Sequence, residues 1–298
     1  MRAFAVIVCL AVCSLMTCCS EQTKSPKVKT SAQHHLNLIV SQKKMIEIPG
    51  GTYKAFIGKD SGRIVRVQTF YLDDSPVTNR EYLDFLKANP QWTRSKVLRL
   101  YADTNYLKHW KSDYEIPTGA SPEAPVTNIS WFAAEAYAKS TGKRLPAIDE
   151  WEYAALADQQ TPDASKDPAF TDYILKAYQK KDKNKQPIKQ EPPNYYGVYN
   201  MYGMVWEWTY DFNSVMMSGE SRKDNTVNDN LFCAGAAVTS SDLRNYAAFI
   251  RYALRGSTKA DYCLNNLGFR CAKNKIDPYE KYNPDITDFD HDILWQEK

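Results

Sequence analysis

The chain has 298 residues, room for one large domain or two modest ones, and 43% of them are hydrophobic, so disorder of the whole chain is excluded. The formal net charge is only +3, from 38 Lys and Arg against 35 Asp and Glu, which argues against a dedicated nucleic-acid-binding protein. The 20 Tyr and 7 Trp favour a loop-rich domain whose rings are partly buried and partly hydrogen-bonded.

The N-terminal segment is typical of a secretory signal. An apolar run follows Arg2, from Ala3 to Met16, and is too short for a transmembrane helix. Leu15-Met16-Thr17-Cys18 resembles a bacterial lipoprotein box, with Cys19 as the alternative lipid acceptor. We therefore expect a signal peptide over residues 1–18 and a mature protein anchored by its lipid to a membrane of the bacterial cell envelope, facing the periplasm or the outer membrane. A buried N-terminal helix is the alternative.

Residues 19–44 are polar and rich in Lys, Ser, Thr and Gln, which predicts a flexible tether in front of a domain over residues 45–275. Removal of the signal leaves three cysteines in that domain: Cys233, Cys263 and Cys271. No CxxC pair occurs among them, so a zinc ribbon is unsupported. In an oxidising envelope they suggest one disulfide and one odd thiol.

The first ordered elements are expected to be strands. Residues 46–53 alternate around a Pro-Gly-Gly turn, which predicts a hairpin, and residues 63–72 alternate as one strand. Three helices should follow. Thr78 or Asn79 can cap the first, over 78–86; Ser130 can cap the second, over 131–141, which Gly142 ends; and Asp149 can cap the third, over 149–157.

Two further segments are polar. Residues 158–193 carry a cluster of lysines, which predicts either a solvated insertion loop or an electrostatic docking patch. Residues 276–298 form an acidic tail, which is either a solvated extension or lies back on the basic loop.

Several motifs together resemble the sulfatase-modifying-factor family, named for the formylglycine-generating enzyme. They occur in family order over about residues 45–273, as Ile48-Pro49-Gly50-Gly51-Thr52-Tyr53, Pro76-Val77-Thr78-Asn79-Arg80-Glu81-Tyr82, Pro125-Val126 with Ser130-Trp131, Gly142-Lys143-Arg144-Leu145-Pro146 with Glu150-Trp151-Glu152-Tyr153, Gly197 to Gly203 with Trp206-Glu207-Trp208, and Asn266-Leu267-Gly268-Phe269-Arg270-Cys271. The resemblance implies a single compact α+β domain of C-type-lectin-like type with little regular secondary structure.

The family enzyme oxidises a cysteine of a sulfatase peptide to formylglycine, and its reaction needs two thiolates that hold monovalent copper, for which thiolate is the soft ligand. Ungapped counting from Gly268-Phe269-Arg270 places Arg251 and Arg255 on family arginines, and the two thiol positions on Asp242 and Ala247. Neither residue supplies sulfur, so copper and formylglycine generation are not expected. The remaining pocket candidates are Cys233, Thr239, Asp242, Arg251 and Arg255.

The resemblance also bears on a disulfide and on a calcium site. The usual disulfide partner of Cys271 falls on Ala138, so that bridge cannot form. A structural calcium site of the family matches Asn200, Gly203, Val205 and Glu207, where two side chains and two main-chain carbonyls would bind the ion; the alternative is that Asn200 and Glu207 only hydrogen-bond their loop. The aromatic residues 206, 208, 210 and 212 either line a peptide groove or belong to the core.

Residues 232–236 and 245–255 also resemble a narrower subgroup, the NirV-type accessory proteins linked with copper nitrite reductases. Three functions follow as expectations. The first is a lipid-anchored binding, accessory or maturation factor with a peptide or protein partner. The second is an oxidoreductase with altered chemistry, built from Cys233, Asp242, Arg251 and Arg255. The third is a structural lipoprotein of a secretion or gliding apparatus.

Overall fold

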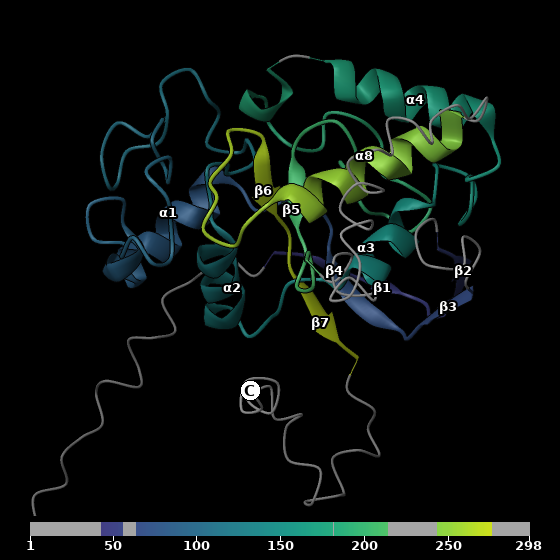
Figure 1. The fold of residues 1–298 in the computed structure, drawn as a ribbon, viewed down its shortest axis with the longest axis horizontal. Coiled ribbons are helices and arrows are strands. Elements are labelled where there is room, and N and C mark those ends of the chain that lie inside the picture. Colours follow the sequence, from purple (N-terminus) through teal and green to yellow (C-terminus); the bar gives the residue numbers. More distant parts are fainter. Residues whose placement is uncertain (1–42, 56–63, 181, 214–242, 276–298) are drawn as a thin grey trace, which may run out of the picture. The chain divides into compact units, whose positions relative to one another are not determined.

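The computed structural model describes residues 43–55, 64–180, 182–213 and 243–275, with only the backbone for residues 243–246 and 249. These residues lie in one compact unit (Figure 1). Within them no helix is both long and apolar enough to cross a bilayer. The predicted signal peptide, the lipid acceptors Cys18 and Cys19, most of the tether and the acidic tail lie outside the described residues, as do Cys233, Thr239 and Asp242.

The strands of the described chain form three small sheets. β4 (Phe70–Asp73) is the middle of one sheet and pairs antiparallel with β1 (Met45–Ile48) and with β7 (Ala272–Asn274). β2 (Gly51–Lys54) pairs antiparallel with β3 (Ile64–Val67), and β5 (Trp206–Trp208) pairs parallel with β6 (Leu267–Phe269). The sheets therefore join segments that lie far apart in the sequence.

The predicted hairpin over residues 46–53 is wrong. β1 and β2 do not pair with each other, because Ile48 lies opposite Phe70 while Gly51 lies opposite Val67. The predicted single strand over 63–72 is also interrupted, between Val67 and Phe70, opposite the interruption between β1 and β2. There the Gly50 N–H donates to Thr69 Oγ1 (3.0 Å). The two halves of that segment pair separately with the two halves of the expected hairpin.

The first two helices confirm the predictions. α1 (Asn79–Ala88) begins at a capping box, in which Thr78 Oγ1 accepts the Glu81 N–H and the Glu81 carboxylate accepts the Thr78 N–H. α2 (Trp131–Ser140) begins after Ser130, whose Oγ accepts the Ala133 N–H. A single 3-10 turn (Pro90–Trp92) follows α1, and buried aromatic side chains of α1, α2 and β6 form one hydrophobic core.

The third helix, α3 (Ile148–Ala155), exists, but Asp149 is not its cap. The N–H of the N-cap residue Ala147 donates to the Glu150 carboxylate, and the first helical N–H, of Ile148, donates to Asp211, which is far away in the sequence. Asp149 instead accepts a hydrogen bond from the Tyr53 hydroxyl. Tertiary contacts therefore replace the local cap.

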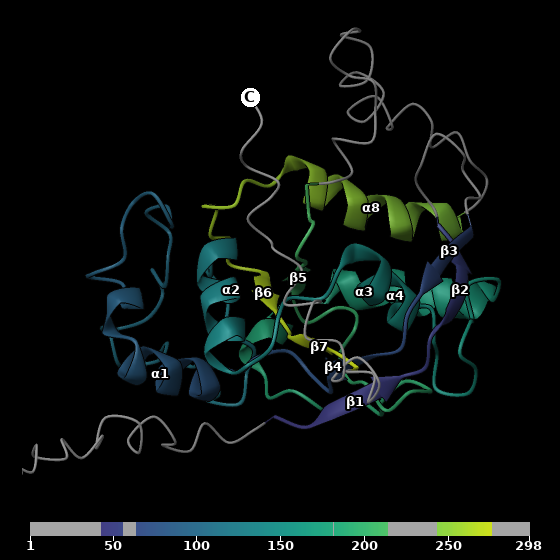
Figure 2. The same cartoon turned by 90° about the horizontal axis from the view of Figure 1, so that it is seen from below.

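The prediction of a loop over residues 158–193 is wrong in part, because the segment contains a helix, α4 (Pro168–Gln179). Asp167 caps it by accepting the Ala169 N–H (2.8 Å), and Phe170, Ile174 and Ala177 are buried at helical spacing against the second hydrophobic core. α4 lies beside α8 (Leu243–Ser257), as Figures 1 and 2 show. A 3-10 turn (Lys183–Lys185) follows α4.

Candidate functional site

A buried cluster of one carboxylate and two guanidinium groups joins α3 to α8. Arg251 Nη2 lies 2.7 Å from Glu152 Oε2, and Arg255 Nη1 lies 2.7 Å from Glu152 Oε1. The three side chains are at most 7% exposed. The Arg255 guanidinium also lies 5.0 Å from the ring centroid of Trp151, a cation–π contact. The two arginines that match family arginines therefore serve as partners of Glu152.

The Glu152 carboxyl stays ionised in this cluster. Burial alone raises its pKa, but the charges of Arg251 and Arg255 and their hydrogen bonds outweigh burial and hold the pKa below the usual range. A carboxylate held in this way is fixed in charge and position. It is a structural anchor for α8 and is poorly suited to proton transfer.

The described part of the chain offers no thiolate pair. Ala247, which the counting from Gly268-Phe269-Arg270 puts at one expected thiol position, is buried on α8, and its carbonyl accepts a hydrogen bond from Arg251 Nη1 (3.0 Å). Cys263 and Cys271 are both free and buried, so neither forms the disulfide that the cysteine count suggests. Burial raises the pKa of both thiols, and the charge of Asp103 adds to this for Cys263 while that of Asp73 adds to it for Cys271. Such thiols remain protonated and poor as copper ligands.

Two of the four predicted calcium ligands, Asn200 and Glu207, contact the guanidinium group of Arg270, whereas Gly203 and Val205 line the neighbouring pocket. Arg270, which is fully buried, donates from Nε to Glu207 Oε2 (2.7 Å) and from Nη2 to Glu207 Oε1 (2.8 Å) and to the carbonyl oxygen of Asn200 (3.1 Å). Glu207 Oε2 also accepts from Trp151 Nε1 (2.7 Å). Asn200 Oδ1 accepts the Lys189 N–H (2.8 Å).

This arrangement does not fit the calcium ion that the resemblance implies. Both Glu207 oxygens and the Asn200 side-chain oxygen already have donors, and an ion bound there would add positive charge beside a buried arginine. In the described segments, no group of three or more His, Cys, Asp and Glu side chains could hold a metal. We therefore derive no role for calcium from this site.

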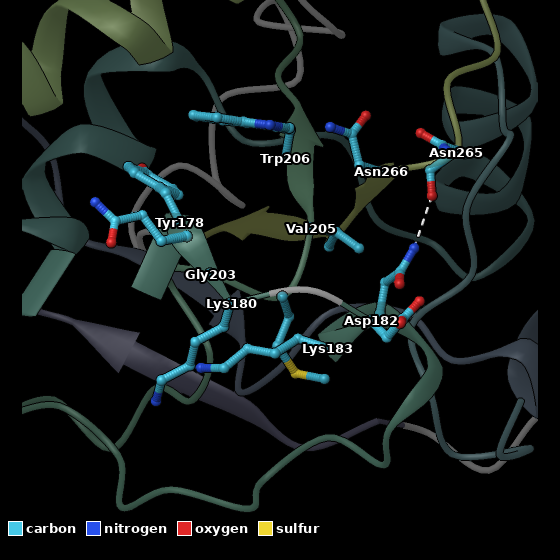
Figure 3. A pocket seen from close by; sticks show the side chains of 12 residues that line it. Tyr178, Lys180, Asp182, Lys183, Gly203, Val205, Trp206, Asn265 and Asn266 are labelled. Carbon is cyan, nitrogen blue, oxygen red and sulfur yellow. Dashed lines mark hydrogen bonds between the residues drawn. The ribbon is translucent and has the colours of Figure 1, made fainter. Parts of the chain in front are cut away.

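A pocket of about 420 Å³ opens beside these residues (Figure 3). One wall is an aromatic pair, in which the rings of Tyr178 and Trp206 stack at 4.6 Å between centroids. The amide side chain of Asn266 lies next to Trp206, with that of Asn265 beyond it (Figure 3). Lys180, Asp182 and Lys183 line the pocket from the segment after α4. Both lysines pair with Glu191, at 3.4 Å and 3.1 Å. The pocket therefore combines an apolar platform with amide and charged groups.

Three separate segments hold this pocket together. Trp206 N donates to the Asn266 carbonyl (2.8 Å) where β5 meets β6, and Asn184 Nδ2 donates to the Asn265 carbonyl (2.7 Å). Gly203 allows α4 to approach, because its φ is +83° and a Cβ there would lie 2.7 Å from the Ala177 carbonyl oxygen. The end of α4 is thereby fixed against the strand that carries Trp206.

The sequence identified part of this site. Of the alternating aromatic residues, Trp208 and Phe212 belong to the core, whereas Trp206 is half-buried and lines the pocket. Glu152, the partner of both arginines, and Tyr178, in the segment expected to be a loop, were missed as site residues. For Tyr178 the helical spacing of residues 170, 174 and 177 was an available signal.

Comparison with known proteins places this geometry in context. Residues 32–275 match the family described as the sulfatase-modifying factor enzyme 1-like domain. The inactive C-alpha-formylglycine-generating enzyme 2 of Mus musculus is 29% identical, with 79% of this chain and 87% of that protein covered. The formylglycine-generating enzyme of Streptomyces coelicolor is also 29% identical, with 78% and 90% covered. The solved structure of PvdO from Pseudomonas aeruginosa is 20% identical, covering 78% of this chain and 95% of that chain, with a TM-score of 0.42. A relative named as inactive and a relative named as the enzyme therefore have the same percentage identity to the chain.

Proposed function

The chain belongs to the sulfatase-modifying factor family, and we propose that it is a member that binds a peptide segment of a partner protein without oxidising it. Family membership alone does not distinguish catalysis from binding, because the chain matches both an inactive relative and a formylglycine-generating enzyme. The residues of the site are what favours binding.

One observation carries the proposal. Ala247 stands where the family chemistry requires sulfur, and the neighbouring arginines Arg251 and Arg255 are closed onto Glu152 inside the protein. The free thiols Cys263 and Cys271 are buried with raised pKa values. These features support a family scaffold whose described residues offer no accessible thiolate pair for copper.

The pocket beside Trp206 supports binding of an extended peptide. The stacked rings of Tyr178 and Trp206 offer a flat apolar surface for a side chain of the partner. Asn265 and Asn266 have amide groups that can donate to and accept from a peptide backbone. Lys180 and Lys183, which share Glu191, and Asp182 make the charged rim of the pocket mixed in sign, so it can meet polar side chains of a partner.

Selection of displayed peptides on the full-length chain tests this proposal. Peptides with an aromatic residue should be enriched, and Trp206→Ala should weaken their binding by about tenfold or more, as expected for loss of an aromatic anchor. Tyr195→Ala, at an exposed ring outside this pocket, is the matched control and should leave the affinity unchanged. Equal affinity in Trp206→Ala, or oxidation of the bound peptide, would contradict the proposal.

The setting of this activity is part of the proposal. The lipoprotein box at Cys18 supports an anchored accessory or maturation factor of the cell envelope. The subgroup resemblance supports a respiratory copper enzyme, such as nitrite reductase, as the partner. Labelling with a radioactive fatty acid, lost in a variant with Cys18→Ala and Cys19→Ala, tests the anchor independently of the pocket.

A further inference from the structure

The loop that follows α1 presents two leucines to solvent. Leu98 is 63% exposed and Leu100 is 73% exposed, although both lie in a well-defined turn. Tyr101, beside them, is 37% exposed. We call residues 96–101 the leucine loop. Burying large apolar side chains is the dominant stabilising force in folding, so two neighbouring leucines held outside the core point to a partner surface.

The leucine loop is fixed by hydrogen bonds and by packing beneath it. Val97 N–H donates to the Thr93 carbonyl (2.9 Å), and Tyr101 N–H donates to the Leu98 carbonyl (2.9 Å), which closes a turn. Tyr101 packs on Phe132 of α2, with 5.4 Å between ring centroids. The leucines are therefore held outward by an ordered base.

Cationic residues outnumber acidic ones in the chain around the leucine loop. Between residues 94 and 115 the sequence has five Lys and Arg residues and three acidic residues, Asp103, Asp113 and Glu115. Asp113 accepts hydrogen bonds from the N–H and the hydroxyl of Ser95, directly before the loop. Arg94 ties the loop to the neighbouring segment by donating to the carbonyls of Lys108 (3.3 Å) and Trp110 (2.8 Å). Within the described residues, no carboxylate forms an ion pair with Lys96, Arg99, Lys108 or Lys111. Their charge is available to an external anionic surface.

We propose that the leucine loop docks onto a bilayer that contains anionic lipid, with Leu98 and Leu100 inserted at the interface and Lys96 and Arg99 at the headgroups. Leucines flanked by cations on one loop are the combination that binds such an interface, since the apolar groups enter the acyl boundary and the cations meet phosphate. The predicted lipid anchor would keep the domain close to a membrane. The proposal does not depend on the peptide-binding pocket, which is lined by other residues.

Photo-crosslinking of the full-length chain on vesicles tests this docking. A benzophenone amino acid replaces Leu100, and the vesicles contain either phosphatidylcholine alone or phosphatidylcholine with phosphatidylglycerol. We expect lipid adducts that increase several-fold with phosphatidylglycerol. The combined change Lys96→Gln and Arg99→Gln should reduce them by about 25-fold, because each cation near an anionic surface contributes roughly a fivefold preference.

The control carries the same benzophenone at Tyr195, which is 54% exposed and lies on another segment. It should give few lipid adducts in either vesicle. Leu98→Gln with Leu100→Gln should leave the melting temperature unchanged, because the leucines are not core residues. The proposal is overturned if benzophenone at position 100 yields no lipid adduct, or if benzophenone at position 195 yields as many adducts as at position 100. It is also overturned if the number of adducts does not depend on phosphatidylglycerol, or if benzophenone at position 100 crosslinks to a second protein chain instead.

Discussion

The substitution Glu152→Gln examines whether the buried cluster anchors α8. It removes the charge that Arg251 and Arg255 share, while the shape of the side chain is kept. Removing one partner of a buried ion pair typically costs about 3–5 kcal/mol, because the remaining charges stay buried without compensation. For a domain of this size, about 2–4 °C of melting temperature corresponds to each kcal/mol, so we expect a fall on the order of 10 °C.

Glu150→Gln is the matched control, two residues earlier on the same helix. Glu150 pairs with Arg144, whose side chain is 32% exposed, and glutamine can still accept the Ala147 N–H. Its cost should therefore be about 1 kcal/mol or less. Urea unfolding followed by circular dichroism measures both variants. If Glu152→Gln costs no more than Glu150→Gln, the cluster does not stabilise α8 as the contacts indicate.

Three further predictions concern pH, backbone and metal. The pKa of Glu152 in the folded state lies below its ordinary value of 4.5. Its contribution to the free energy of unfolding is therefore complete above pH 4.5 and is lost as the pH falls through the folded-state pKa. Urea titrations should show that the difference in free energy of unfolding between the wild type and Glu152→Gln becomes smaller below about pH 4.5, and a constant difference would refute this. Gly203→Ala should lower the melting temperature more than Gly119→Ala, because both have positive φ but only at Gly203 would a Cβ meet the Ala177 carbonyl, and equal effects would rule out the close approach. Millimolar calcium or EDTA should change the melting temperature by less than about 1 °C. A bound ion at a hundred times its dissociation constant would instead add about 2.7 kcal/mol to the free energy of unfolding and raise the melting temperature by several degrees. A calcium-dependent rise in melting temperature that disappears in Glu207→Gln would restore the predicted calcium site.

Local signals in the sequence predicted the elements whose ends are determined locally. The Thr78–Glu81 capping box and the Ser130 cap lie within one turn of the helices they start, and both are where they were expected. The strand pairing was not accessible in this way, because β1 and β7 meet on β4 from opposite ends of the domain. The start of α3 failed for a similar reason, since its acceptor Asp211 comes from a distant segment.

The site shows the same division. Arg251 and Arg255 were identified by their spacing from Gly268-Phe269-Arg270, but the carboxylate that pairs with them was not; the other pocket candidate near them, Asp242, lies outside the described residues. The structure pairs them with Glu152, about a hundred residues earlier, and no local pattern encodes a contact of that span. The pocket likewise joins α4, β5 and the segment before β6, which only the tertiary fold brings together.

The proposed function requires that the domain does not carry out the oxidation that the family resemblance implies. Mass spectrometry measures this directly, after a sulfatase-derived cysteine peptide has been incubated with the full-length chain, monovalent copper and oxygen. We expect the peptide mass to stay unchanged while the protein remains folded. Formation of the aldehyde at a rate above that of the peptide with copper alone would contradict the account.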